Sequence, residues 1–243
     1  MKFLCLCAVF NHSQEWAENA IHCFQQQTHP DRTLLILDDR PPEYRWPNVR
    51  EYTENLDSNV LYAVVPNFGN MAKKYNYGLQ FAKDNGIGYS GVTIYDDDDH
   101  FLPDHLERHA AVLENNAWSM PEAILSLYGP SVIRIAPSFL YWSSYAFRRE
   151  ITDKHGFGDY GGLGYDQEFV KLCRREYGEP GIMTGSPTYL YNFSGIPHLS
   201  VTGKSYDDTS WVKNVIPVAA TGPLKPKPHP LMTMALGMAK DWL

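Results

Sequence analysis

Short apolar runs that stop at Asn or Asp alternate with helical repeats along the first half of the chain. Residues 3–10 stop at Asn11, residues 34–37 stop at Asp38, and residues 91–95 run into four consecutive aspartates. A continuous apolar run is typical of a strand that is buried on both faces, as in a parallel sheet. Parallel strands need long crossovers, which the helical repeats supply. The pattern therefore predicts an α/β fold.

Apolar side chains that recur every three or four residues predict four helices between and after these runs. Their ranges are 13–24, 71–82, 103–114 and 166–176. Other short apolar runs predict further strands at 61–65, 123–128, 131–135 and 138–147. We expect a mostly parallel central sheet with helices on both faces and a smaller mixed or antiparallel β region.

Composition excludes several classes of protein. With 243 residues, 44% of them apolar, the chain is long enough to bury a large core. The formal net charge of −7 argues against a broad nucleic-acid-binding face, so we expect no nucleic-acid partner. No apolar stretch approaches the ~20 residues of a membrane-spanning helix. Residues 1–10 lack a cleavage site, so we interpret them as a strand and not as a signal peptide.

The four cysteines show no pairing pattern. Cys5, Cys7, Cys23 and Cys173 form neither a CxxC pair nor a dense framework, as expected for reduced, buried thiols. We therefore expect a reducing compartment and a cytoplasmic protein.

Four consecutive aspartates, Asp96 to Asp99, directly follow the predicted strand at 91–95. Like charges at this spacing destabilise one another, which predicts a bound cation. Oxygen ligands suit Mn²⁺ or Mg²⁺, with a diphosphate completing the coordination. The alternative is a solvated turn or a helix cap.

Two further aspartates, Asp38 and Asp39, end another strand. Ligands of parallel sheets bind beyond the carboxyl ends of the strands, so these carboxylates could accept hydrogen bonds from a nucleobase or a ribose. The alternative is a turn before Pro41 and Pro42. Lys73 and Lys74, at the start of the following helix, could neutralise a phosphate, or they could be ordinary surface.

Four segments, in this order, resemble glycosyltransferases of family 2. FLCLCAVFNHSQEWAENAIHCFQQQTHPDRTLLILDD is similar to the opening strand, helix and strand of the family, and GNMAKKYNYGLQFA to its next helix with Asn-x-Gly. YDDDDHFLPDHL resembles the metal-binding Asp-x-Asp segment, and AFRREITDKHGFGDYGGLGYDQEFVKLCRR the glycine-rich loop and acid-bearing helix. Together they cover residues 3–176. The resemblance implies a nucleotide-diphospho-sugar transferase with a Rossmann-like GT-A fold.

The resemblance also implies which residues hold the donor and the metal. The donor-binding set is Phe10, Asn11, Asp38, Asp39, Lys73, Asp96 and Asp97. Within it, Asp39 would read the base, and Asp96 would face the ribose or the metal. Asp98 would hold the metal together with Asp96, and Asp99 is the reserve ligand. His198 would supply a third metal ligand, with His229 as the competing candidate.

An acid at the start of the helix predicted at 166–176 would act as the general base. The acidic pair that the family has there is Tyr165-Asp166 in this chain, so its first acid is missing and the second is kept. Asp166 would then deprotonate the acceptor in an in-line, inverting attack, and Glu168 is the alternative base. Trp142 and Tyr165 would contact the acceptor, although such aromatics are more often core.

We therefore expect a metal-dependent glycosyltransferase that moves a sugar from a nucleotide-diphosphate sugar to an acceptor hydroxyl on a glycan, a lipid or a protein. We expect the donor to be a UDP-sugar. The alternatives are a sugar nucleotidyltransferase and a non-catalytic nucleotide- or carbohydrate-binding protein of the same fold.

We expect the GT-A domain over 1–221, with its nucleotide half at 1–115 and its acceptor half at 116–221. Residues 222–243 would form a Pro-rich spacer and a docking helix through which the chain could oligomerise.

Overall fold

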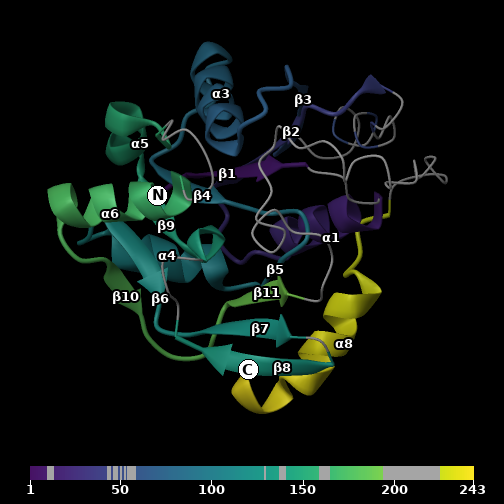
Figure 1. The fold of residues 1–243 in the computed structure, drawn as a ribbon. Helices are drawn as coiled ribbons and strands as arrows, with labels where there is room; N and C mark the ends of the chain where they lie inside the picture. The colour runs from purple at the N-terminus through teal and green to yellow at the C-terminus, as the bar shows by residue number, and fades with distance from the viewer. Residues whose placement is uncertain are drawn as a thin grey trace.

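Strand β1 (Phe3–Ala8) lies inside a seven-stranded sheet in the computed structural model of the chain (Figure 1). It pairs in parallel with β2 (Arg32–Asp38) on one side and with β4 (Gly91–Ile94) on the other. β3 (Val60–Val64) extends the parallel part beyond β2. All six residues of β1 are buried, as its continuous apolar run predicts.

The structure describes residues 1–9, 14–42, 45, 49, 51, 53, 59–128, 130–136, 141–158, 165–193 and 225–243. Three short strands complete the sheet, in the order β10-β6-β9-β4-β1-β2-β3. They are β6 (Trp118–Pro121), β9 (Ala146–Arg148) and β10 (Gly181–Met183). β9 runs antiparallel to both of its neighbours, and the other pairs are parallel. The expected mostly parallel sheet is therefore confirmed.

A second, smaller sheet has the order β5-β11-β7-β8. Its strands are β5 (His100–Phe101), β7 (Ile124–Tyr128), β8 (Ser131–Ile135) and β11 (Tyr189–Phe193). β11 pairs in parallel with β7 and antiparallel with β5, and β8 pairs antiparallel with β7. This is the mixed β region that the sequence predicts. Because β5 begins directly after Asp99, the aspartate run joins the two sheets.

Helices cover both faces of the large sheet (Figure 1). They are α1 (Gln14–Gln25), α3 (Met71–Asp84), α4 (His105–Leu113), α5 (Arg149–His155) and α6 (Tyr165–Tyr177). The even-numbered side chains of β1 pack with α3, α5 and α6, and the odd-numbered ones pack with α1 and α4. This alternation follows from the two-residue period of a strand. In the described part of the chain, no helix is long and apolar enough to cross a membrane.

The prediction of a strand over 138–147 is only partly correct. Residues 137–140 lie outside the described residues, and a 3-10 turn, η2 (Trp142–Ser144), precedes the three-residue strand β9. The backbone N–H of Tyr145 closes this turn on the carbonyl of Trp142, at 2.9 Å. Apolar content alone does not separate a short strand from a buried turn, which explains the error.

The C-terminal segment packs against the second sheet. Helix α8 (Pro230–Met238), followed by the short turn η4 (Lys240–Trp242), buries Met232 and Ala235 in a cluster with side chains of β7, β8 and β11. His229 caps α8, because its Nδ1 accepts a hydrogen bond from the backbone N–H of Leu231 at 3.2 Å.

The Asn76-x-Gly78 pair of α3 fixes this helix against its neighbours. Oδ1 of Asn76 accepts a hydrogen bond from the backbone N–H of Phe157 at 2.7 Å, next to Gly156, whose φ of 58° lies in the left-handed region. A Cβ on Gly78 would lie 2.8 Å from Cδ1 of Leu37 and 3.0 Å from Cδ2 of Leu6. A Cβ at position 78 would therefore force one of these buried leucine side chains to shift where α3 crosses β1 and β2.

We predict that Gly78→Ala lowers the free energy of unfolding by about 1–3 kcal/mol, because the added methyl overpacks the contact between helix and sheet. Gly88→Ala is the matched control, since a Cβ there meets nothing within 4 Å. Urea denaturation of both variants measures the effect. Equal stability of Gly78→Ala and the wild type would contradict this close packing.

Candidate functional site

Acidic residues follow two strands at one edge of the large sheet. Because β1, β2 and β4 are parallel neighbours, their carboxyl ends meet at the same edge. Asp38 and Asp39 lie at the end of β2, and Asp96 to Asp99 follow β4. We call these six residues the acidic edge. The predicted residues Phe10, Asn11 and His198 lie outside the described residues.

Asp38 is engaged within the protein. Its fully buried carboxylate accepts hydrogen bonds from the guanidinium of Arg40 at 2.8 and 2.9 Å and from the hydroxyl of Tyr62 at 2.5 Å. Burial pushes the pKa of Asp38 upward, but the hydrogen bonds and charge of Arg40 outweigh it and hold the pKa below its usual value. These contacts indicate that Asp38 stabilises the end of β2.

Asp39 pairs with a lysine that reaches the edge from α3. Nζ of Lys74 donates 2.7 Å hydrogen bonds both to Oδ1 of Asp39 and to the carbonyl of Val9. Lys74 is 1% exposed and Asp39 is 11% exposed. Lys74 therefore joins the ends of β1 and β2, whereas the predicted Lys73 has an exposed side chain.

Asp96 is held by hydroxyl groups from two different elements. The hydroxyl of Tyr75 on α3 donates to Oδ1 at 3.1 Å, and the hydroxyl of Ser143 in η2 donates to Oδ2. Desolvation and the negative charge of Asp98 raise the pKa of Asp96 to about 6, against the lowering effect of these two hydrogen bonds. The half-buried Asp96 thus connects helix α3 to the turn η2.

The other three aspartates of the run are buried. Asp99 accepts hydrogen bonds from the hydroxyl of Tyr189 and from the backbone N–H of Asn192, the latter at 2.9 Å, so it ties β11 to this loop. Burial and the neighbouring carboxylates raise its pKa well above the usual value. Asp97 and Asp98 are 2% and 5% exposed. Asp99 therefore has a structural role, which makes Asp98 the better ligand candidate.

The donor set of the acidic edge suits a divalent cation only in part. Within the described ranges, no group of three His, Cys, Asp or Glu side chains has the geometry to hold a metal ion. Mg²⁺ and Mn²⁺, however, are commonly held by one or two carboxylates while phosphate oxygens and water complete the shell. A carboxyl group whose pKa is raised by burial and by a neighbouring negative charge, as that of Asp96 is by Asp98, would also be stabilised as a carboxylate by a cation. The residues present fit such an ion as partial ligands.

Asp166 lies in the first turn of α6, next to an aromatic group that leads back to Asp96. The ring of Tyr165 packs edge-on against Trp142, with the centroids 5.1 Å apart, and Trp142 packs edge-on against Tyr75 at 5.5 Å. Desolvation raises the pKa of the half-buried Asp166 above its usual value. Two aromatic contacts thus link Tyr165, the sequence neighbour of Asp166, to Tyr75, which donates to Asp96.

The competing candidates for these roles have other contacts. His229 stacks on Trp16 with the ring centroids 3.7 Å apart, and its Nδ1 caps α8, so this nitrogen is engaged in the helix cap. Glu168 is exposed and forms a 2.6 Å ion pair with Lys171. The contact of Glu168 does not direct it to the acidic edge. The backbone N–H of His229, however, donates to Oδ1 of Asn19 at 3.2 Å, and Nδ2 of Asn19 donates to the carbonyl of Asp99 at 2.7 Å, so His229 lies near this edge.

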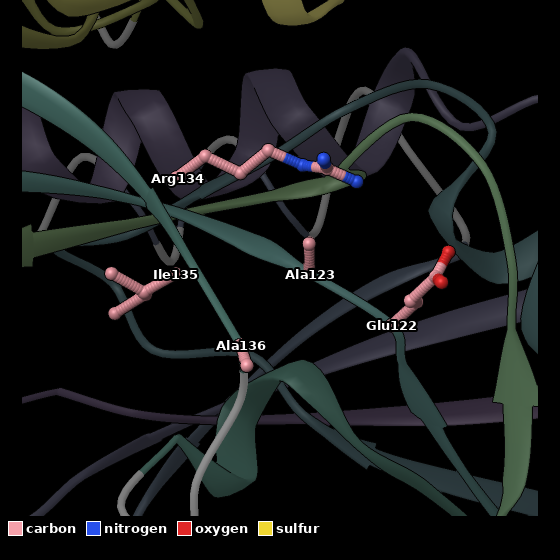
Figure 2. Close-up of a pocket in the computed structure, with 5 residues that line it drawn as sticks. All are labelled: Glu122, Ala123, Arg134, Ile135 and Ala136. Carbon is pink, nitrogen blue, oxygen red and sulfur yellow. The ribbon is translucent and has the colours of Figure 1, made fainter.

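A shallow hollow of about 290 Å³ lies elsewhere, at the second sheet. It is lined by Glu122, Ala123, Arg134, Ile135 and Ala136. Figure 2 shows that the Arg134 and Glu122 side chains lie on either side of it. None of its lining residues belongs to the acidic edge, so we do not place the functional site there.

The sequence indicates Lys74 only as a phosphate candidate beside Lys73, and the roles of Tyr75 and Ser143 were missed. Lys74 shares a helix face with Gly78, four residues later, and this spacing could have identified it as the lysine that faces the sheet. Tyr75 belongs to the apolar stripe of α3, where its hydroxyl gave no separate signal. Ser143 contacts a residue 47 positions away, and no local pattern marks that contact.

The chain belongs to glycosyl transferase family 2, whose profile matches residues 6–162, more than half of the sequence. Similar solved structures include residues 1–349 of S. aureus TarS, alone and in complex with UDP. Both have a TM-score of 0.63 and 16% identity over 79% of this chain.

A longer S. aureus TarS structure also has a TM-score of 0.63, with 17% identity over 80% of this chain. This chain spans 60% of the two shorter TarS chains and 37% of the longer one. A comparison with curated protein sequences finds no match. The expected family is confirmed by the profile, and the likeness to TarS supports the GT-A fold.

We predict that Lys74→Met destabilises the protein by about 3–5 kcal/mol, because it leaves the carboxylate of Asp39 without its ion-pair partner in a mostly buried position. Lys73→Met, one residue away on an exposed position, should change the free energy of unfolding by less than about 0.5 kcal/mol. Urea denaturation at neutral pH measures both variants. Similar losses in the two variants would show that the Lys74 ion pair does not stabilise the strand ends.

Proposed function

We propose that the chain transfers a sugar from a nucleotide-diphosphate sugar to a hydroxyl group of an acceptor. The observation that carries this proposal is the acidic edge, where Asp96 is bonded to Ser143 in η2, the turn whose Trp142 packs on Tyr165 at the start of α6. One carboxylate region can then face the donor while a separate carboxylate, on α6, faces the acceptor. The complex of TarS with UDP, a protein of the same fold, favours a uridine nucleotide as the donor.

The donor would lie across the carboxyl ends of β1, β2 and β4. Asp39, oriented by Lys74, would accept a hydrogen bond from the base. Asp96 and Asp97 would face the ribose and the diphosphate, with Phe10 and Asn11 completing the base pocket. Lys73 is exposed near this edge and remains a candidate for the phosphate.

Asp98, together with Asp96, would hold a Mn²⁺ or Mg²⁺ ion, with His198 as a further candidate ligand. When bound, such an ion supplies several kcal/mol of stabilisation to the negative charge of the leaving diphosphate.

Asp166 would act as the general base in an inverting displacement. The acceptor oxygen forms a bond to the anomeric carbon of the donor sugar, the bond from this carbon to the phosphate oxygen breaks, and the acceptor proton moves to the Asp166 carboxylate. Desolvation raises the pKa of Asp166, which strengthens it as a base once it is ionised. Trp142 and Tyr165, whose rings pack on each other, would contact the acceptor.

The acceptor would be a hydroxyl of a glycan, a lipid or a protein. We further propose a cytoplasmic location, supported by four buried cysteines that form no disulfide. Residues 1–221 would form the transferase domain, and α8 could carry an oligomer contact, since Met234 and Met238 are exposed on it.

We predict that Mn²⁺ strengthens UDP binding to the wild type and that Asp98→Ala removes this gain, because the variant lacks the main proposed ligand of the ion. A thermal-shift panel of nucleotides and nucleotide sugars, with and without Mn²⁺, measures both effects. Asp84→Ala, an exposed aspartate at the end of α3, is the control and should behave as the wild type. Unchanged UDP affinity of Asp98→Ala in the presence of Mn²⁺ would exclude Asp98 as a ligand.

We predict that Asp166→Asn lowers transfer, or donor hydrolysis, by about 10²–10⁴-fold while UDP binding stays nearly intact, because only proton removal is lost. Activity of the wild type should fall as the pH decreases, since protonation of Asp166 removes the base, and this loss should occur above the pH expected for an ordinary aspartate. Glu168→Gln is the control. Wild-type turnover of Asp166→Asn, or a comparable loss in Glu168→Gln, would contradict the assignment.

A further inference from the structure

We infer that Tyr75 and Ser143 form a two-sided clamp that holds the Asp96 carboxylate in the orientation required for donor binding, so both are positioning residues. This inference rests on the proposed function, because it concerns how the donor site is assembled. It differs from that proposal in that neither hydroxyl has to touch the donor.

The clamp uses both oxygens of the carboxylate. The Tyr75 hydroxyl donates to Oδ1 and the Ser143 hydroxyl donates to Oδ2. A carboxylate that accepts a hydrogen bond on each oxygen loses its freedom to rotate about the bond that carries it. Asp96 then presents its remaining lone pairs in a fixed direction.

Each hydroxyl is itself held by its own element. Tyr75 is fully buried, and its ring packs edge-on against Trp142 at 5.5 Å and Phe157 at 5.8 Å. His109 of α4 holds the turn η2, which carries Ser143, because Nε2 of His109 lies 3.1 Å from the carbonyl oxygen of Ser144. These contacts do not involve Asp96, so the two donors are preorganised before a ligand arrives.

The clamp also connects the two halves of the predicted domain. Tyr75 comes from α3 in the nucleotide half, and Ser143 comes from the acceptor half, next to Trp142. Trp142 contacts both Tyr75 and Tyr165. The turn η2 therefore both orients the Asp96 carboxylate, through Ser143, and packs against Tyr165 at the start of α6, through Trp142.

The test compares Tyr75→Phe and Ser143→Ala with matched controls. Tyr75→Phe keeps the ring and removes only the hydroxyl. Tyr89→Phe is its control, because the Tyr89 hydroxyl has no hydrogen-bond partner among the described residues. Ser144→Ala is the control for Ser143→Ala, since the Ser144 hydroxyl donates to the carbonyl of Tyr141 in the same turn.

Calorimetric titration with UDP and Mn²⁺ should show about tenfold weaker binding for Tyr75→Phe and for Ser143→Ala, as expected for losing one hydrogen bond to a charged group. Both controls should bind UDP within about twofold of the wild type. With a UDP-sugar as donor, KM should rise about tenfold in the two clamp variants while kcat changes by less than about twofold. A merely structural role would lower stability, measured by urea denaturation, without this selective rise in KM.

Wild-type affinity for UDP in both clamp variants would overturn the clamp and leave the proposed function standing. Equal loss of affinity in the clamp variants and in their controls would also overturn it. A wild-type chain that binds no nucleotide with Mn²⁺ would overturn the proposed function, and the clamp with it.

Discussion

A buried carboxylate is costly unless it is hydrogen-bonded or paired with a positive charge, and this constraint organises the strand ends of the protein. Asp38 is compensated by Arg40, and Asp39 by Lys74, which reaches across from α3. Asp99 accepts hydrogen bonds from groups of β11 in the second sheet, although burial and the neighbouring carboxylates still raise its pKa. Because these partners come from different elements, satisfying the carboxylates also fixes the positions of α3, β11 and the loop after β4. The acidic edge therefore holds these elements together and is also the candidate donor site.

The contacts of Asp96 also explain how the candidate donor and acceptor sites can be positioned relative to each other. Asp96 contacts α3 through Tyr75 and the second half of the domain through Ser143. The turn that carries Ser143 also carries Trp142, which packs against Tyr165 at the start of α6. A change in the orientation of η2 would thus alter both the orientation of the Asp96 carboxylate and the aromatic packing at the start of α6, where the proposed base lies. Proximity and orientation of this kind are a large part of the barrier reduction in group transfer.

Much of the fold follows from the sequence, because long apolar runs and helical repeats depend on local periodicity. The burial of β1 on both faces and the position of the aspartate run after β4 were predictable in this way. Short elements such as β5, with two residues, are too short for any period to be recognised. The spacing of Lys74 and Gly78 indicates which lysine faces the sheet, but the ion pair of Lys74 with Asp39 depends on tertiary packing. The Ser143 contact depends on a turn placed by tertiary packing, so no local pattern predicts it.

The central claim is that the nucleotide diphosphate and its metal ion bind at the acidic edge. A crystal structure of the chain with UDP and Mn²⁺, recorded with anomalous scattering from manganese, tests it most directly. The account predicts one anomalous peak within coordination distance of the Asp98 carboxylate and the diphosphate, with the base near Asp39. A nucleotide bound at the hollow beside Glu122 and Arg134, or manganese remote from the carboxyl ends of β2 and β4, would contradict it.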